Sequence, residues 1–277
     1  MNSPVTTRTE PDADLLRRIE TFYDAVPRLG ARAEVLGPLV LFVREGAGWP
    51  YYARPTSPDV HITELDVRAV RARMSQLAVP HQFEWVHDLT PSLTEAVASN
   101  GLPVQRCPLM VLDVDALTVP LVADVEVQLG GPDDDDLAAS EAVASVAFGA
   151  GIGTRVGEAG LAERAQAEAA QDPARLASRR DGIRRGEQVR AVARTADGPV
   201  GSGGYQHAAG VAELVGIATL PAFRRRGIAA ALAGVLASAA LEDGQHTVFL
   251  AAQDEDVARV YERVGFRRLA TAGIAEG

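Results

Sequence analysis

The stretch that decides the fold reads Glu213-Leu-Val-Gly-Ile-Ala-Thr-Leu-Pro-Ala-Phe-Arg-Arg-Arg-Gly-Ile-Ala229. It predicts a strand that ends at Thr219, because Pro221 forbids its simple continuation. A helix is predicted to begin near Gly227, since the apolar residues that follow recur along one helical stripe. Such a strand-turn-helix directs free backbone N–H groups and the positive end of a helix dipole at one point, which predicts an anion site. The alternative is a solvated arginine cluster at a helix start.

The segments around this stretch predict a C-terminal half with a meander of antiparallel strands. Four consecutive aspartates at 133–136 precede an alanine-rich helix. We interpret them as a helix N-terminus that complements the helix dipole rather than as a metal site. The predicted elements are the strands 125–129, 188–195, 200–207, 211–219 and 247–252, the helical region 158–185 and the helix 254–263.

The N-terminal half alternates helical and strand-like patterns in the same way. The predicted elements are the helices 12–23, 65–77 and 91–99 and the strands 39–43, 82–86 and 109–114, with a loop rich in glycine, proline and tyrosine at 46–58. Residues 115–124 contain Pro120 and show no clear periodicity, which is typical of a boundary. We therefore expect two domains, 1–118 and 119–277.

A faint internal repeat relates the two halves. When Gly101 is placed on Gly265, a shift of 164 residues, the strand, helix and turn at 82–102 fall on 246–266. The same shift places residues 60–68 on 224–232, and the earlier copy has no glycine-arginine signature there. If the halves are duplicates, the first has lost whatever the second binds.

Composition and charge exclude several classes of protein. The 277 residues suffice for about two domains. Cys107 is the sole cysteine, and neither CxxC nor HExxH spacing occurs, so disulfide scaffolds and the common zinc sites are excluded. All 27 basic residues are arginine, which excludes a lysine nucleophile. The net charge of −10 disfavours general binding to nucleic acid or an anionic membrane and favours a cationic partner.

The sequence indicates a cytoplasmic protein. Residues 1–14 lack the basic-then-apolar order of a signal peptide. The most apolar stretch, 227–241, is too short to span a bilayer.

The strand-turn-helix resembles the acyl-CoA signature of the GNAT superfamily of N-acetyltransferases, [RQ]-x-x-G-x-[GA], which stands here as Arg224-Arg-Arg-Gly227-Ile-Ala229. The order of elements up to Val264-Gly265-Phe266 also follows the family, and the resemblance covers about 125–270. It implies an α/β (α+β) fold of two GNAT-like halves, each a mixed, mostly antiparallel twisted sheet flanked by helices. The first half resembles a degenerate copy.

The resemblance implies acetyl-CoA as the acyl donor and no metal. The last residues of the strand would meet the pantetheine arm, and the turn with the helix start would hold the pyrophosphate. Family members often have an asparagine where this chain has Asp254, which accepts but does not donate a hydrogen bond. The expected cofactor-binding residues are Ile217, Ala218, Thr219, Arg224, Arg225, Arg226, Gly227, Ile228, Ala229, Ala230 and Asp254.

Two residues are the candidates for catalysis. Glu213 lies on an otherwise apolar strand face, where desolvation should raise its pKa, and the family reading is a general base. Tyr261 stands where the resemblance implies a general acid for the departing thiolate. The alternatives are an ordinary carboxylate at a strand edge and a core aromatic. His207 is a reserve candidate for the base, although a structurally bonded histidine is the simpler interpretation.

The resemblance thus predicts transfer of an acetyl group from acetyl-CoA to a primary amine, directly in a ternary complex. The acceptor is expected to be a small-molecule or peptide amine, with no nucleic acid or membrane as partner and with the oligomeric state open. The family builds acceptor pockets from the loop that corresponds to 148–160. The alternative function is a non-catalytic acyl-CoA-binding sensor or interaction module.

Overall fold

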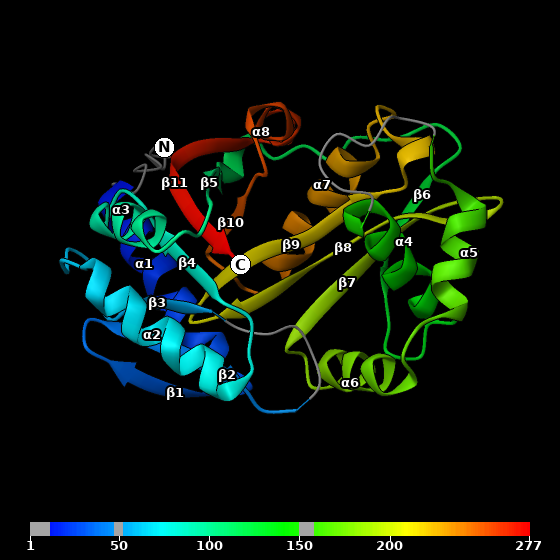
Figure 1. The fold of residues 1–277 in the computed structure, drawn as a ribbon. Coiled ribbons are helices and arrows are strands. Elements are labelled where there is room, and N and C mark those ends of the chain that lie inside the picture. Colours follow the sequence, from blue (N-terminus) through cyan, green and yellow to red (C-terminus); the bar gives the residue numbers. More distant parts are fainter. Residues whose placement is uncertain (1–11, 47–51, 150–157) are drawn as a thin grey trace, which may run out of the picture.

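The strands of the protein join into one continuous mixed sheet. The computed structural model describes residues 12–46, 52–149 and 158–277. In that part of the chain 11 strands lie in the order β1-β2-β3-β4-β11-β5-β10-β9-β8-β7-β6, with helices packed along the sheet (Figure 1). The pairs β3–β4 and β9–β10 are parallel, and the other pairs are antiparallel. The expected fold class is confirmed.

The helices and strands have the following bounds. The strands are β1 Ala31–Leu36, β2 Leu39–Arg44, β3 Ala53–Pro55, β4 Gln82–Val86, β5 Val104–Leu112, β6 Glu126–Gly130, β7 Gln188–Thr195, β8 Gly198–Ala208, β9 Val211–Thr219, β10 Thr247–Ala251 and β11 Phe266–Glu276. The α-helices are α1 Asp12–Ala25, α2 Glu64–Leu77, α3 Ser92–Ser99, α4 Leu137–Gly149, α5 Leu161–Ala169, α6 Pro173–Arg184, α7 Ile228–Glu242 and α8 Glu255–Glu262. Short 3₁₀ turns lie at Pro27–Leu29, Val114–Ala116 and Pro221–Phe223.

The two halves exchange one strand each at the centre of the sheet. β5, the last strand of the N-terminal half, pairs with β10 of the C-terminal half. β11, in turn, pairs with β4 along one edge and with β5 along the other. β4 and β5 are therefore consecutive in the chain but separated by β11 in space (Figure 1). The sheet runs unbroken through both expected domains, 1–118 and 119–277, and the boundary between them stays a prediction.

The internal repeat has a structural counterpart. Shifting the N-terminal elements by 164 residues places α2 on α7, β4 on β10, α3 on α8 and β5 on β11, each to within two residues at either end. In the N-terminal half, β5 follows α3 and joins the strands of the C-terminal half. In the C-terminal half, β11 follows α8 and joins the strands of the N-terminal half. The exchange is therefore reciprocal, and the two copies of the repeat have an approximate twofold relationship at the centre of the sheet.

Three strands and one break between helices were not predicted from the sequence. β1 is an edge strand with mostly exposed side chains, so it lacks the apolar alternation of a half-buried strand. β3 lies inside the expected loop 46–58 and has only three residues. β11 is rich in arginine, alanine and glycine, and its pairing with two strands holds it in the sheet. The helical region 158–185 is two helices, because Asp172 caps α6 and Pro173 begins it.

The segment between the halves is anchored to the C-terminal helices. The backbone N–H of Asp113 donates to the carbonyl of Gly265 at 2.9 Å. The Thr118 hydroxyl donates to the carbonyl of Arg263 at 2.8 Å. A Cβ on Gly265 would lie 2.6 Å from the carbonyl oxygen of Ala116, and φ there is +111°. Gly265 therefore permits both the turn and the close approach of the linker.

Replacing Gly265 by alanine should lower the free energy of unfolding by about 2–4 kcal/mol, because the new methyl meets backbone at a left-handed position. Its repeat counterpart Gly101 has φ +78° and open space at its Cβ. Gly101→Ala should therefore lose only about 1 kcal/mol from backbone strain. Denaturant unfolding followed by circular dichroism measures both variants, and equal losses would contradict the packing role of Gly265.

Candidate active site

The site begins where two parallel strands part. β9 pairs with β10 only at its first three residues, as far as Glu213 opposite Phe249. Beyond that point β10 continues along β5, while β9 keeps its partner β8. In the described sheet the backbone of β9 after Glu213 therefore has one edge without a strand partner. This edge offers hydrogen-bonding groups to a ligand.

The free edge of β9 also contains a bulge. The register with β8 shifts there, and Gly216 has φ +62°, which glycine adopts without steric cost. The residues expected to meet the pantetheine arm, Ile217, Ala218 and Thr219, follow the bulge. The Thr219 hydroxyl is buried and has no hydrogen-bond partner within the described residues. A polar group of a ligand would satisfy it.

The start of α7 is open for an anion. Gly227 is the N-cap residue with φ +88°, and no side chain caps the helix. Arg225 in the preceding turn also has a positive φ, +62°. The first-turn N–H groups, at Ile228, Ala229 and Ala230, therefore point out of an uncapped helix N-terminus. Together with the free edge of β9, this geometry fits the pantetheine and pyrophosphate groups of an acyl-CoA.

The three arginines of the turn differ in their contacts and exposure. The Arg224 guanidinium donates to the carbonyl of Ala147 at 3.1 Å and to that of Thr219 at 3.4 Å, so it braces the turn against α4. The Arg226 guanidinium lies 5.5 Å from the ring centroid of Phe223. Arg225 and Arg226 are exposed, and they are the two cations that the turn presents to solvent.

The corresponding helix start in the N-terminal half is already occupied. The shift of 164 residues places Thr63 at the position of Gly227. Thr63 forms a capping box with Asp66, whose carboxylate accepts from the Thr63 N–H at 2.8 Å. Glu64 adds a second carboxylate in the first turn of α2. Two acidic side chains at this helix start repel an anion, so α2 does not offer the open N-terminus that α7 has.

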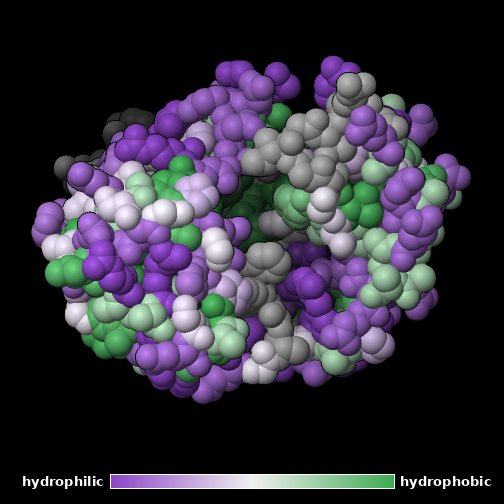
Figure 2. All heavy atoms as spheres, viewed as in Figure 1, coloured by the Kyte–Doolittle hydropathy of each residue, from purple (hydrophilic) through white to green (hydrophobic). Residues whose placement is uncertain are grey.

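A cavity of about 740 Å³ lies between the halves, on the face of β9 that carries Glu213. Figure 2 shows the molecule hollowed at this place. One wall comes from α1 and β4, with Tyr23 and Glu84, and the other from α4, α6 and β7, with Glu141 and Arg190. Side chains of both halves therefore surround Glu213.

Two neighbours hold the Glu213 carboxylate. Gln206 Nε2 donates to its Oε2 at 2.9 Å, and the Tyr23 hydroxyl donates to its Oε1 at 3.3 Å. Burial raises the pKa of Glu213 to about 7, and the two hydrogen bonds oppose this rise because they favour the charged form. A carboxylate with a pKa near neutrality is suited to general-base work. No pattern in the sequence pointed to Tyr23, which lies 190 residues earlier in the chain.

A second carboxylate faces the cavity. Glu84 on β4 makes no hydrogen bond or ion pair within the described residues. Burial, together with the charges of Glu213 and Glu276, raises the pKa of Glu84 to about 8, while Arg54 opposes the rise. Its alternation with the buried Phe83 and Trp85 reads as an ordinary strand, so no pattern in the sequence singled it out.

The remaining catalytic candidate, Tyr261, lies in an apolar cluster on α8 and contacts the ring of Phe266. Burial raises its pKa, so its hydroxyl stays protonated, and that hydroxyl has no hydrogen-bond partner in the described chain. Tyr261 does not appear among the described residues that line the cavity. The structure thus does not place it beside Glu213. Asp254 caps α8 by accepting from the Val257 N–H at 2.9 Å.

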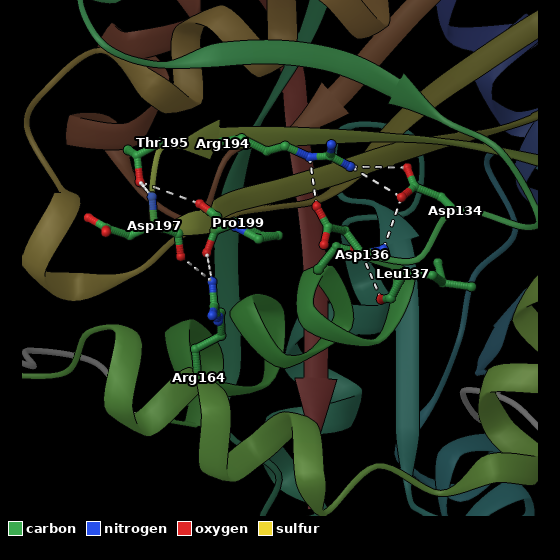
Figure 3. Close-up of polar contacts among 10 residues, drawn as sticks. Asp134, Asp136, Leu137, Arg164, Arg194, Thr195, Asp197 and Pro199 are labelled. Carbon is green, nitrogen blue, oxygen red and sulfur yellow. Dashed lines mark hydrogen bonds and ion pairs between the residues drawn. The ribbon is translucent and has the colours of Figure 1, made fainter.

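Two other features of the sequence are structural. His207 contacts the carbonyl oxygen of Gly186 through Nε2 at 2.6 Å, which agrees with a structurally bonded histidine. In the aspartate run, Asp134 and Asp136 pair with Arg194 of β7 (Figure 3). Arg164 of α5 donates nearby to the carbonyls of the turn between β7 and β8. The run thus binds arginine at the start of α4. Of the loop 148–160, residues 150–157 lie outside the described ranges.

The comparisons with known proteins agree with this geometry. Residues 161–266 match the acetyltransferase (GNAT) family. The C-terminal half therefore carries a GNAT acetyltransferase domain, as the signature at Arg224 predicted. Among curated proteins, none matches the chain.

Solved structures share the fold over nearly the whole chain. A GCN5-related N-acetyltransferase from Kribbella flavida is 22% identical with a TM-score of 0.69, covering 94% of this chain and 95% of that one. One from Sphaerobacter thermophilus is 18% identical, with a TM-score of 0.57 and coverage of 98% and 94%. A tandem GNAT protein from the clavulanic acid biosynthesis pathway is 17% identical, with a TM-score of 0.52 and coverage of 86% and 78%. These likenesses show the tandem fold.

The described residues contain neither a metal-binding cluster nor a membrane-spanning helix. No three histidine, cysteine, aspartate or glutamate side chains gather there to hold a metal ion. None of the helices described is long and apolar enough to cross a membrane.

The Glu213 carboxyl should titrate near pH 7, and Gln206→Leu should move that titration upward, because it removes a hydrogen bond that favours the charged form. The measurement is ¹³C NMR of glutamate side-chain carboxyl groups, with Glu213→Gln to assign the signal. Gln105→Leu is the matched control, because Gln105 is exposed and bonds only the carbonyl of Gln253. A Glu213 signal that titrates near pH 4.5 would contradict the burial of its carboxylate.

Proposed function

We propose that the protein is an acetyl-CoA-dependent N-acetyltransferase whose C-terminal half holds the acyl donor. One observation carries the proposal: β9 leaves β10 at Glu213 and ends in a turn whose helix, α7, has no side-chain cap. The same strand thus presents a free edge and anion site at one end and a buried carboxylate facing a cavity at the other. The N-terminal half acts as a scaffold and supplies Tyr23.

The donor would be held by the backbone of Ile217 to Thr219 and by the first-turn N–H groups of α7. The exposed Arg225 and Arg226 would add positive charge near the pyrophosphate. Asp254 would contribute through the start of α8 rather than through a side-chain contact, because its carboxylate already caps that helix. When bound, acetyl-CoA supplies an acetyl group activated as a thioester.

Glu213 would act on the acceptor. Its deprotonated carboxylate takes a proton from the acceptor ammonium, directly or through water, and leaves a nucleophilic amine. Gln206 and Tyr23 hold the carboxylate in place while its pKa stays near 7. As the new N–C bond forms and the C–S bond breaks, the protonated hydroxyl of Tyr261 would supply a proton to the sulfur, and the second proton that the nitrogen loses would return to the tyrosine through solvent. Transfer is direct, in a ternary complex.

The acceptor would be a primary amine of a small molecule or peptide. The cavity is large enough for such a molecule, because binding pockets for small ligands have volumes of about 300–1,000 Å³. Carboxylates near the proposed amine position would favour a cationic group. A cytoplasmic location, and the absence of nucleic acid and membrane partners, remain predictions from the sequence.

Gly227→Glu should abolish binding of acetyl-CoA, because the new carboxylate clashes with and repels the pyrophosphate at the start of α7. Isothermal titration should find micromolar binding in the wild type and none in this variant. Gly244→Glu is the matched control: Gly244 follows the other end of α7, has φ +80° and has open space at its Cβ. It carries the same backbone strain and charge and should bind normally.

Absence of binding in the wild type would overturn the assignment of the donor. Binding without release of thiol across a panel of amines would favour the alternative, a non-catalytic acyl-CoA-binding module. Equal loss in both glutamate variants would point to a general effect of charge rather than to the α7 site.

Tyr261→Phe should lower turnover by about 10²-fold or more while leaving the affinity for acetyl-CoA nearly unchanged, because only the proton donor is removed. Thiol release gives the turnover, and isothermal titration gives the affinity. Normal turnover in this variant would remove Tyr261 from the mechanism and leave it as a core aromatic.

A further inference from the structure

The floor of the cavity is made of two rows of residues on three strands. Gln188 on β7 lies opposite Gln206 on β8, which lies opposite Glu213 on β9. In the next row Arg190 lies opposite Gly204, which lies opposite Val215. Rows two residues apart project from the same face of a sheet. Arg190 and Glu213 therefore share the face that borders the cavity.

Arg190 extends over Gly204 toward the middle of this floor. A Cβ on Gly204 would lie 2.9 Å from Arg190 Nη1 and 3.0 Å from its Cδ, so the missing side chain of Gly204 makes room for the arginine. The Arg190 side chain is only 7% exposed. Its Nη2 donates to Glu141 at 2.9 Å, while its Nε is buried and has no hydrogen-bond partner in the described chain. A buried guanidinium whose Nε donor has no partner in the described chain lies at the cavity.

The charges around Arg190 do not cancel. Glu141 of α4 also accepts from Arg179 of α6, at 3.3 Å. Two guanidinium groups thus share one carboxylate, which leaves this cluster with a net charge of +1. Arg190 and Glu141 are buried and Arg179 is partly exposed, so solvent screens the excess charge only in part and a counter-ion would stabilise it. The region around Arg190 therefore fits an anionic group of a ligand.

The neighbouring part of the cavity has the opposite character. Glu213 binds Tyr23 and Gln206, and the unpaired Glu84 faces the same space from β4. The charge of Glu213 raises the pKa of Glu84, which indicates that the two carboxylates sense each other. A cationic group placed between them would stabilise both carboxylates in their charged form. The cavity thus has an acidic end and a basic end.

We propose that the acceptor is an amino carboxylate, bound with its amine at Glu213 and its carboxylate at Arg190. The proposal rests on the function proposed above and adds the substrate class. Gly204, under the guanidinium, is one strand and two residues away from Glu213, which corresponds to about 8 Å between their Cα atoms. That spacing suits an amine and a carboxylate several bonds apart, as in an ω-amino acid, better than the adjacent groups of a free α-amino acid.

The test compares three probes of equal chain length: 5-aminopentanoate, pentylamine and pentanoate. Isothermal titration into the wild-type protein should show 5-aminopentanoate binding at least tenfold more tightly than either of the others, because only it satisfies both ends. Thiol release from acetyl-CoA should show the same preference for 5-aminopentanoate over pentylamine.

Arg190→Met should reduce the preference for 5-aminopentanoate over pentylamine by about 10- to 100-fold, since a charged hydrogen bond to the carboxylate is lost. The variant leaves Glu141 paired with Arg179. If Arg190→Met does not fold, Arg179→Met provides the second measurement, because it removes the same net charge from a less buried position. Arg268→Met, at an exposed pair with Glu255, is the control and should keep the preference.

The outcomes separate the two proposals. Equal binding of 5-aminopentanoate and pentylamine to the wild type, or no binding of 5-aminopentanoate, would overturn the amino carboxylate class while leaving acetyl transfer to other amines intact. An unchanged preference in Arg190→Met would also overturn it. Tight binding of 5-aminopentanoate without thiol release would support the anion and amine subsites and contradict the proposed function.

Discussion

The exchange of β5 and β11 is the constraint on which the rest of the structure depends. Because β5 of the N-terminal half lies beside β10, β10 has a partner on the side away from β9 and can leave β9 after three residues. The parting of these strands opens the edge where a donor would bind. The same exchange holds α1 against Phe249 of β10, and this contact positions the Tyr23 hydroxyl at Glu213.

The two copies of the repeat differ in whether the start of their helix is open to a ligand. α2 follows β3 and α7 follows β9, but Thr63 and Asp66 close the start of α2 while Gly227 leaves that of α7 open. The closed copy still contributes to the site, since it supplies one wall of the cavity. In the proposed function one half holds the donor, and side chains of both halves surround the space beside Glu213.

The sequence predicted the strand, turn and helix around Gly227 because their signals are local. The strand, turn and helix around Gly227 are contiguous, and the expected strand-helix order was confirmed. β1, β3 and β11 were missed because short, exposed or alanine-rich strands carry no strong alternation and depend on their neighbours. Tyr23 and Glu84 were missed because their meeting with Glu213 depends on packing between distant segments, which no spacing encodes.

The order of strands at the centre of the sheet also determines when β4 and β5 can gain their partner during synthesis. β11 inserts between β4 and β5 although it follows β5 by about 150 residues. Until β11 has been synthesised, the facing edges of β4 and β5 have no partner, so the growing chain carries two open strand edges through most of its synthesis. A nascent chain of this kind needs protection from pairing with other chains.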